Sequence, residues 1–170
     1  MRPDDAQLTG YKLLDDLERV IRLILLYPQG LSILLGYVSP PSSLELLSAF
    51  PPKAFDSLGI HCSQRPYEER ITEMSAWIDD VIRQSGGWEH ICQSVRDWKR
   101  MHLGDWDMMA DHIRAVRPRQ RWLNRTALQQ LADVYRVDCR TIQRKRRAFP
   151  GILAEFILFG QRGDADEGCN

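Results

Sequence analysis

Residues 126–147 read TALQQLADVYRVDCRTIQRKRR, and this stretch decides the fold of the C-terminal part of the chain. Apolar or small side chains recur at helical spacing up to Tyr135, and a second helical pattern follows Asp138. We therefore expect two short helices joined by a tight turn. The side chains expected to form the core of this unit are Leu128, Leu131, Ala132, Val137 and Ile142. Ala132 is placed where the helices cross, because close approach there requires a small side chain.

The same stretch contains signals for the ends of these helices. Thr126 and Gln129 have the spacing of a capping box, which predicts that the first helix begins at this point. Asp138 is a suitable cap for the second helix. Arg136 occupies the turn, where the backbone is expected to be left-handed or nearly so.

The charge of the chain is concentrated in this region, although the formal net charge of the whole chain is zero. Residues 112–147 contain eleven Lys and Arg residues and two acidic residues, which gives +9. Residues 1–111 contain eleven basic and seventeen acidic residues, which gives −6, and residues 148–170 contain one and four, which gives −3. A segregated basic region of this kind is typical of proteins that bind a polyanion such as DNA.

The second helix divides its polar residues between two expected roles. Its outward face would read bases, because arginine pairs with guanine and glutamine with adenine in the major groove. The predicted base-reading residues are Arg140, Gln143, Arg144 and Arg147. Other basic side chains are expected to hold phosphates and set the register on the duplex. The predicted phosphate-binding residues are Arg117, Arg119, Arg121, Arg125, Arg136, Lys145 and Arg146.

Residues 131–145, LADVYRVDCRTIQRK, resemble the helix-turn-helix of bacterial and phage regulators. Region 4 of sigma factors, the C-terminal domains of resolvases and invertases, and phage late-gene activators are similar in this segment. The resemblance covers about residues 124–148 and departs from the pattern at Arg136, where glycine is usual, and at Lys145, where an apolar residue is common. It implies a transcriptional regulator that places its second helix in the major groove of double-stranded DNA. By analogy, RNA polymerase is a possible partner of the acidic residues 1–104.

The rest of the chain also has mostly helical patterns. Helices are predicted over residues 13–27, 44–50, 68–84, 88–102 and 106–116, with the type of residues 31–37 left open. Gly104 is expected to break the chain before Asp105 caps the next helix. No alternating strand pattern of useful length is found, so the predicted fold class is all-α. We divide the chain into an acidic, Trp-rich body (1–104), a helix-turn-helix region (105–160) and a disordered tail (161–170).

Several other classes of protein are disfavoured by the sequence. The four cysteines are far apart and residues 1–10 are polar, which favours a reduced, cytoplasmic protein without a signal peptide. Arg22 and the Pro28–Gly30 break argue against a membrane span. We expect no catalytic residues, no enzyme activity and no cofactor, because no nucleophile elbow, phosphate loop or metalloprotease helix is present. The spacing of His61, Cys62, His90 and Cys92 fits zinc poorly, so no metal is expected. The five tryptophans are expected in the core.

Three functions remain open. The first is a sequence-specific regulator, as a monomer or homodimer. The second is a DNA-packaging or recombination accessory protein, similar to a small terminase subunit, which uses the same motif in a ring. The third is a helical interaction protein that binds no nucleic acid and holds a protein partner through the apolar residues 152–159. Sizing chromatography separates the first two, and gel shifts at low salt separate both from the third.

Overall fold

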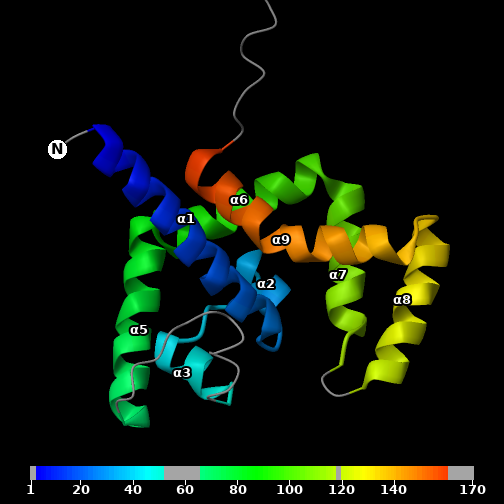
Figure 1. Cartoon of the computed structure of the whole chain (residues 1–170), viewed down its shortest axis with the longest axis horizontal. Helices are drawn as coiled ribbons and strands as arrows, with labels where there is room; N and C mark the ends of the chain where they lie inside the picture. Colours follow the sequence, from blue (N-terminus) through cyan, green and yellow to red (C-terminus); the bar gives the residue numbers. More distant parts are fainter. Residues whose placement is uncertain (1–2, 52–65, 118–119, 161–170) are drawn as a thin grey trace, which may run out of the picture.

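The computed structural model describes residues 3–51, 66–117 and 120–160, and this part of the chain is helical with short connections (Figure 1). Its helices are α1 (Pro3–Leu26), α2 (Gly30–Leu34), α3 (Ser43–Ser48), α5 (Tyr67–Gln84), α6 (Gly87–Met101), α7 (Leu103–Ala115), α8 (Arg121–Tyr135) and α9 (Cys139–Phe159). No strand occurs in these residues, so the all-α prediction is confirmed for them. The predicted tail and Arg119 lie outside the described residues.

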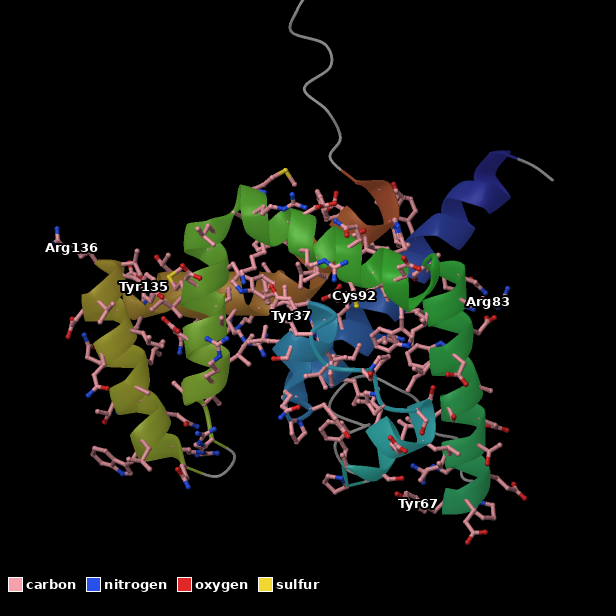
Figure 2. The ribbon with its side chains drawn as sticks, turned by 180° about the vertical axis from the view of Figure 1, so that it is seen from behind. Tyr37, Tyr67, Arg83, Cys92, Tyr135 and Arg136 are labelled. Atoms are coloured by element: carbon pink, nitrogen blue, oxygen red, sulfur yellow. The ribbon has the colours of Figure 1, made fainter. Side chains whose placement is uncertain are left out.

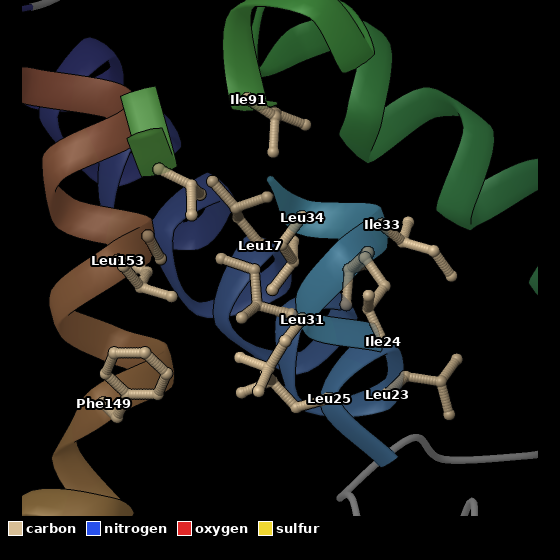
Figure 3. Close-up of a cluster of buried hydrophobic side chains, with 14 of the residues drawn as sticks. Leu17, Leu23, Ile24, Leu25, Leu31, Ile33, Leu34, Ile91, Phe149 and Leu153 are labelled. Carbon is tan, nitrogen blue, oxygen red and sulfur yellow. The ribbon is translucent and has the colours of Figure 1, made fainter. Parts of the chain in front are cut away.

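The centre of the body is a hairpin of α1 and α2. Helix α1 begins about ten residues before the predicted start, and its second half is buried through Leu17, Ile21 and Ile24, among others (Figure 3). Gln29 makes the turn with a left-handed φ of 61°. A side chain at Gly30 would place its Cβ 1.9 Å from the carbonyl oxygen of Ile24, so only glycine permits this hairpin. None of the described helices combines the length and the apolar character that crossing a lipid bilayer requires.

The remaining helices of the body begin close to the predicted positions, with one difference at α7. Ser42 caps α3 by accepting a hydrogen bond from the Glu45 amide at 3.2 Å. The break before α7 lies at His102, two residues before Gly104, which is part of the first turn of α7. Asp105 is therefore inside the helix and does not cap it. The prediction was wrong because it treated glycine as a helix breaker, whereas a first turn tolerates it.

Helix α9 connects the basic region to the body. The sequence predicted a short helix followed by a separate apolar segment, but α9 is one helix of 21 residues that continues through Pro150. Its C-terminal half is buried against α1 and α6 through Phe149, Leu153 and Ile157, among others. The apolar end of α9 therefore packs back onto helices of the N-terminal body.

The described helices share one continuous hydrophobic core, which extends from α1 to α9. Where α9 enters the body, Phe149 makes edge-on contacts with Trp98 and Trp106, with ring centroids 5.6 and 5.8 Å apart. The boundary predicted at residue 104 thus crosses a shared core. In the described residues it marks a change in surface charge and not a change in packing.

Candidate nucleic-acid interface

The turn between α8 and α9 has the geometry that the sequence predicted. Arg136 is left-handed, with φ 54° and ψ 44°, and Figure 2 shows its side chain at the tip of the molecule. The amide of Val137 donates to the carbonyl oxygen of Ala132 at 3.1 Å, which closes α8. Asp138 accepts a hydrogen bond from the Thr141 amide at 2.7 Å and so caps α9. This hydrogen bond lowers the pKa of Asp138, because it stabilises the ionised carboxylate.

The predicted core of this unit is present, but its predicted beginning is wrong. Ala132 and Ile142 are buried, and Leu128, Leu131 and Val137 are partly buried against the same core. Thr126 is not a cap, because α8 begins five residues earlier, at Arg121. The Thr126 hydroxyl instead donates to the carbonyl oxygen of Trp122 at 3.1 Å, as threonine often does inside a helix.

Ala132→Leu is expected to destabilise the protein by about 1–3 kcal/mol, because the larger side chain overpacks a site with 3% exposure. Urea unfolding followed by circular dichroism measures the effect. Ala148→Leu is the matched control, since Ala148 is exposed on α9. Equal stability of the two variants would mean that Ala132 does not set the distance between α8 and α9.

Helix α7 supports both helices of the unit. The Tyr135 hydroxyl donates to Asp111 of α7, and burial, followed by this bond, raises the pKa of Tyr135 to about 12. The Lys145 ammonium of α9 pairs with Asp105 of α7 at 2.6 Å. Asn124 of α8 holds the end of the α7–α8 connection through two hydrogen bonds of 2.8 Å to the backbone of Arg117. The second helix is thereby fixed relative to the first by side chains on a third.

The four predicted base-reading residues lie together on one face of α9. Arg140, Gln143, Arg144 and Arg147 are all exposed, and all four line one open hollow with Asp138 and Thr141. At about 100° per residue, this face is opposite to the buried Ile142 and Phe149. This exposed face ends at Gly151, where α1 crosses α9. The two helices are close there, because a Cβ at Gly151 would lie 3.4 Å from the carboxyl group of Glu18 on α1. The free face of residues 140–147 is roughly 12 Å long, similar to the width of a major groove.

The arginines of this face are not neutralised by neighbours along the helix. Five arginines of α1, α5, α6 and α7 are paired with acidic residues three or four positions away, in the pairs Arg19–Asp16, Arg22–Glu18, Arg83–Asp80, Arg100–Asp97 and Arg114–Asp111. Arg140, Arg144 and Arg147 have no such ion pair with any described residue. Their charge is therefore available to an external anion.

The predicted phosphate-binding residues are dispersed. Arg117, Arg121 and Arg125 are exposed near the beginning of α8, at the opposite end of this helix from α9 (Figure 1). Arg136 is exposed at the turn beside the base-reading face. Lys145 is held by Asp105, and Arg146 is half-buried beside Arg22, so neither projects from the exposed face of α9. Both side chains lie away from the exposed face of Arg144, toward the buried side of the helix. A count of basic residues does not show on which side of the helix each one lies.

One aromatic residue lies where the sequence analysis did not expect it. Trp122 is 83% exposed, and with Leu123 and Arg121 it lines a hollow at the beginning of α8. Trp98 and Trp106 are buried and Trp77 and Trp88 pack against the core, so the expectation was wrong for Trp122 only. The helix was expected to begin at Thr126, which left Trp122 without a helical face to assign.

The cysteine and histidine side chains considered for zinc have other partners. The Cys92 thiol lies 3.4 Å from the carbonyl oxygen of Ile33, and His90 Nε2 lies 2.9 Å from that of Ile157. His61 and Cys62 are outside the described residues, and the described part of the chain contains no cluster of potential metal ligands. These contacts give His90 and Cys92 a structural role in joining α6 to α2 and α9.

Comparisons of the chain with protein-family models, with curated proteins and with solved structures found no match. The function must therefore be argued from the geometry described above.

Proposed function

We propose that this protein binds double-stranded DNA sequence-specifically, as a regulator of bacterial or phage type. The first half of α9 is inserted in the major groove, and α8 and α9 act as a helix-turn-helix supported by α7. Arg140, Arg144 and Arg147 donate to guanine edges, and Gln143 pairs with adenine. The bacterial or phage assignment rests on the resemblance of residues 124–148 to such regulators.

One observation carries this proposal. Three arginines without an ion-pair partner among the described residues share an exposed face of one helix with a glutamine, over a length suited to a groove. Leaving such charges unpaired is typical of a surface that exchanges water and counterions for phosphate and base contacts.

The phosphate contacts proposed here are fewer than the sequence predicted. Arg136 lies beside the base-reading face, and Arg117, Arg121 and Arg125 extend the basic surface along α8. Each phosphate neutralised contributes roughly 0.9 to the slope of log affinity against log salt. Four contacts therefore give a slope of about −3.6, which a salt titration of non-specific DNA binding measures.

The direct test of the proposed function is selection of bound sequences from a random pool of double-stranded DNA. Enrichment of a motif with guanines at two or three positions supports base reading by the arginines. Absence of any DNA binding at 50 mM salt rejects the function in favour of a protein-interaction role. A ring of eight or more copies on sizing chromatography favours the packaging role, whereas a monomer or homodimer favours the regulator.

Arg144→Ala is expected to flatten the sequence preference while leaving low-salt, non-specific binding nearly intact. Arg144 is at the centre of the exposed face, and loss of one bidentate contact costs about 1–3 kcal/mol of discrimination. Competition between selected and scrambled DNA gives the ratio of affinities for the variant and the wild type. Equal losses on every DNA would identify Arg144 as a phosphate contact.

A further inference from the structure

A groove formed by α1, α7 and α9 is separate from the proposed base-reading face, although Arg147 lines both. It lies between the ends of α1 and α7 and the middle of α9, and its volume is about 780 Å³. We call it the α1–α7–α9 groove, and it is lined by Arg22, Leu25, Leu26, His112, Ile113, Val116, Arg146, Arg147 and Pro150. A volume of this size falls in the range of small-molecule sites.

The groove has apolar walls that are partly exposed. Leu25 and Leu26 of α1 face Ile113 and Val116 of α7, and Pro150 lies on α9. Leu26 is 56% exposed and Val116 is 39% exposed. Exposed apolar side chains on both sides of one hollow are a favourable surface for the apolar part of a ligand.

The polar residues of the groove are cationic or lack a partner. Arg146 is half-buried and forms no ion pair with a described residue, whereas Arg22 is paired with Glu18 at 2.6 Å. The Nδ1 atom of His112 is buried without a hydrogen-bond partner among the described residues. No acidic side chain lines the groove. A half-buried guanidinium without a carboxylate is unusual, because buried charges in proteins are normally paired.

The pKa shifts of Arg146 and His112 have the direction expected for basic groups that have no anion beside them. Burial first, and then Arg22, lower the pKa of Arg146 from its usual value. Burial first, and then Arg146, lower the pKa of His112. A carboxylate in the groove would offset both effects, since it adds an opposite charge beside the cations.

We propose that the α1–α7–α9 groove binds a small molecule with a carboxylate head and an apolar body. The carboxylate accepts two parallel hydrogen bonds from the Arg146 guanidinium. The apolar body lies between Leu25 and Leu26 on one side and Ile113 and Val116 on the other. The proposed occupant is a molecule free in solution and not a membrane lipid. The groove is a recess between three helices, whereas a membrane is bound by a surface that projects into it.

The position of Arg147 links this groove to DNA binding, and this step rests on the proposed function. Arg147 lines this groove and also lines the hollow with Arg140 and Arg144. A carboxylate within reach of Arg147 competes with DNA for the same guanidinium. Since coupling between two ligands is reciprocal, the carboxylate is an effector that weakens DNA binding.

The test uses octanoate as the probe and 1-octanol as its uncharged analogue, in calorimetric titrations of the full chain. Octanoate is expected to bind at least about tenfold more tightly than octanol. Octanol has no carboxylate and therefore cannot form the charge-assisted hydrogen bond with Arg146. Arg146→Gln is expected to weaken octanoate binding by about tenfold or more. Leu26→Asp, at an exposed position that tolerates a polar residue, is expected to do the same through charge repulsion and loss of apolar contact.

Leu44→Asp is the matched control, because Leu44 of α3 is similarly exposed and does not line the groove. The proposal is overturned if octanoate does not bind, if octanol binds equally well, or if the two leucine variants behave alike. Binding to anionic phosphatidylglycerol vesicles but not to octanoate would assign the groove to a membrane. A wild-type dimer that Leu26→Asp converts to a monomer would assign it to a second copy of the chain.

The regulatory step has a separate readout. Titration of a selected DNA with and without saturating octanoate is expected to show a loss of affinity of about fivefold or more. Octanoate binding without any DNA binding would retain the groove and reject the proposed function. Unchanged DNA affinity would reject the regulatory role of Arg147.

Discussion

A triple variant in which Arg140, Arg144 and Arg147 are each changed to glutamine is expected to bind a selected DNA at least about a hundredfold more weakly. Each bidentate contact to guanine is worth about 1–3 kcal/mol, and the three side chains share one face of α9. The salt dependence of the remaining binding should change little, since base contacts displace few counterions. Fluorescence anisotropy at several salt concentrations measures both quantities.

The control for this experiment is a second triple variant with the same loss of charge. Arg19, Arg83 and Arg100 are surface arginines of α1, α5 and α6, each paired with an acidic residue three positions earlier. Their replacement by glutamine should change DNA affinity by less than about threefold, because their charge is already compensated. If both triple variants weakened binding equally, only net charge would matter, and the base-reading face would be rejected.

Phe149→Ala is expected to lower the free energy of unfolding by about 3–5 kcal/mol. Phe149 is 1% exposed, and its ring meets both Trp98 and Trp106. Its removal would leave a cavity at the point where α9 enters the core and would break two aromatic contacts. Because a domain of this size has a total stability of only about 5–15 kcal/mol, this loss is a large fraction of the total.

Chemical denaturation of the wild type, Phe149→Ala and Phe159→Ala tests this expectation. Phe159 is the last residue of the same helix and is 45% exposed, so its loss should cost about 1 kcal/mol or less. A small effect at both positions would mean that the junction of α9 with the body contributes little to stability.

The helix-end signals explain which parts of the fold could be predicted from the sequence. Asp138 accepts an amide hydrogen bond at the start of α9, and this was predicted because capping depends on neighbours within four residues. The face of Arg140, Gln143, Arg144 and Arg147 was predicted for a similar reason, since helical periodicity alone places them together.

Features that depend on distant residues could not be predicted in this way. The pairing of Lys145 with Asp105 joins residues 40 positions apart, and it removes a cation that the sequence placed on DNA. The continuation of α9 through Pro150 depends on burial against α1 and α6, which outweighs the cost of a proline inside a helix. The α1–α7–α9 groove is likewise formed by three helices that the sequence did not place together.

The continuity of α9 has a mechanical consequence. The first two turns of α9 carry the exposed arginines, and its last turns are buried in the core. The face that carries the arginines is therefore rigidly joined to the body and is not connected to it by a flexible linker. If the protein binds DNA as proposed, the body determines the angle at which the arginines approach a duplex. Heat or a cavity that weakens packing in the core should therefore reduce the difference in affinity between DNA sequences before the chain unfolds.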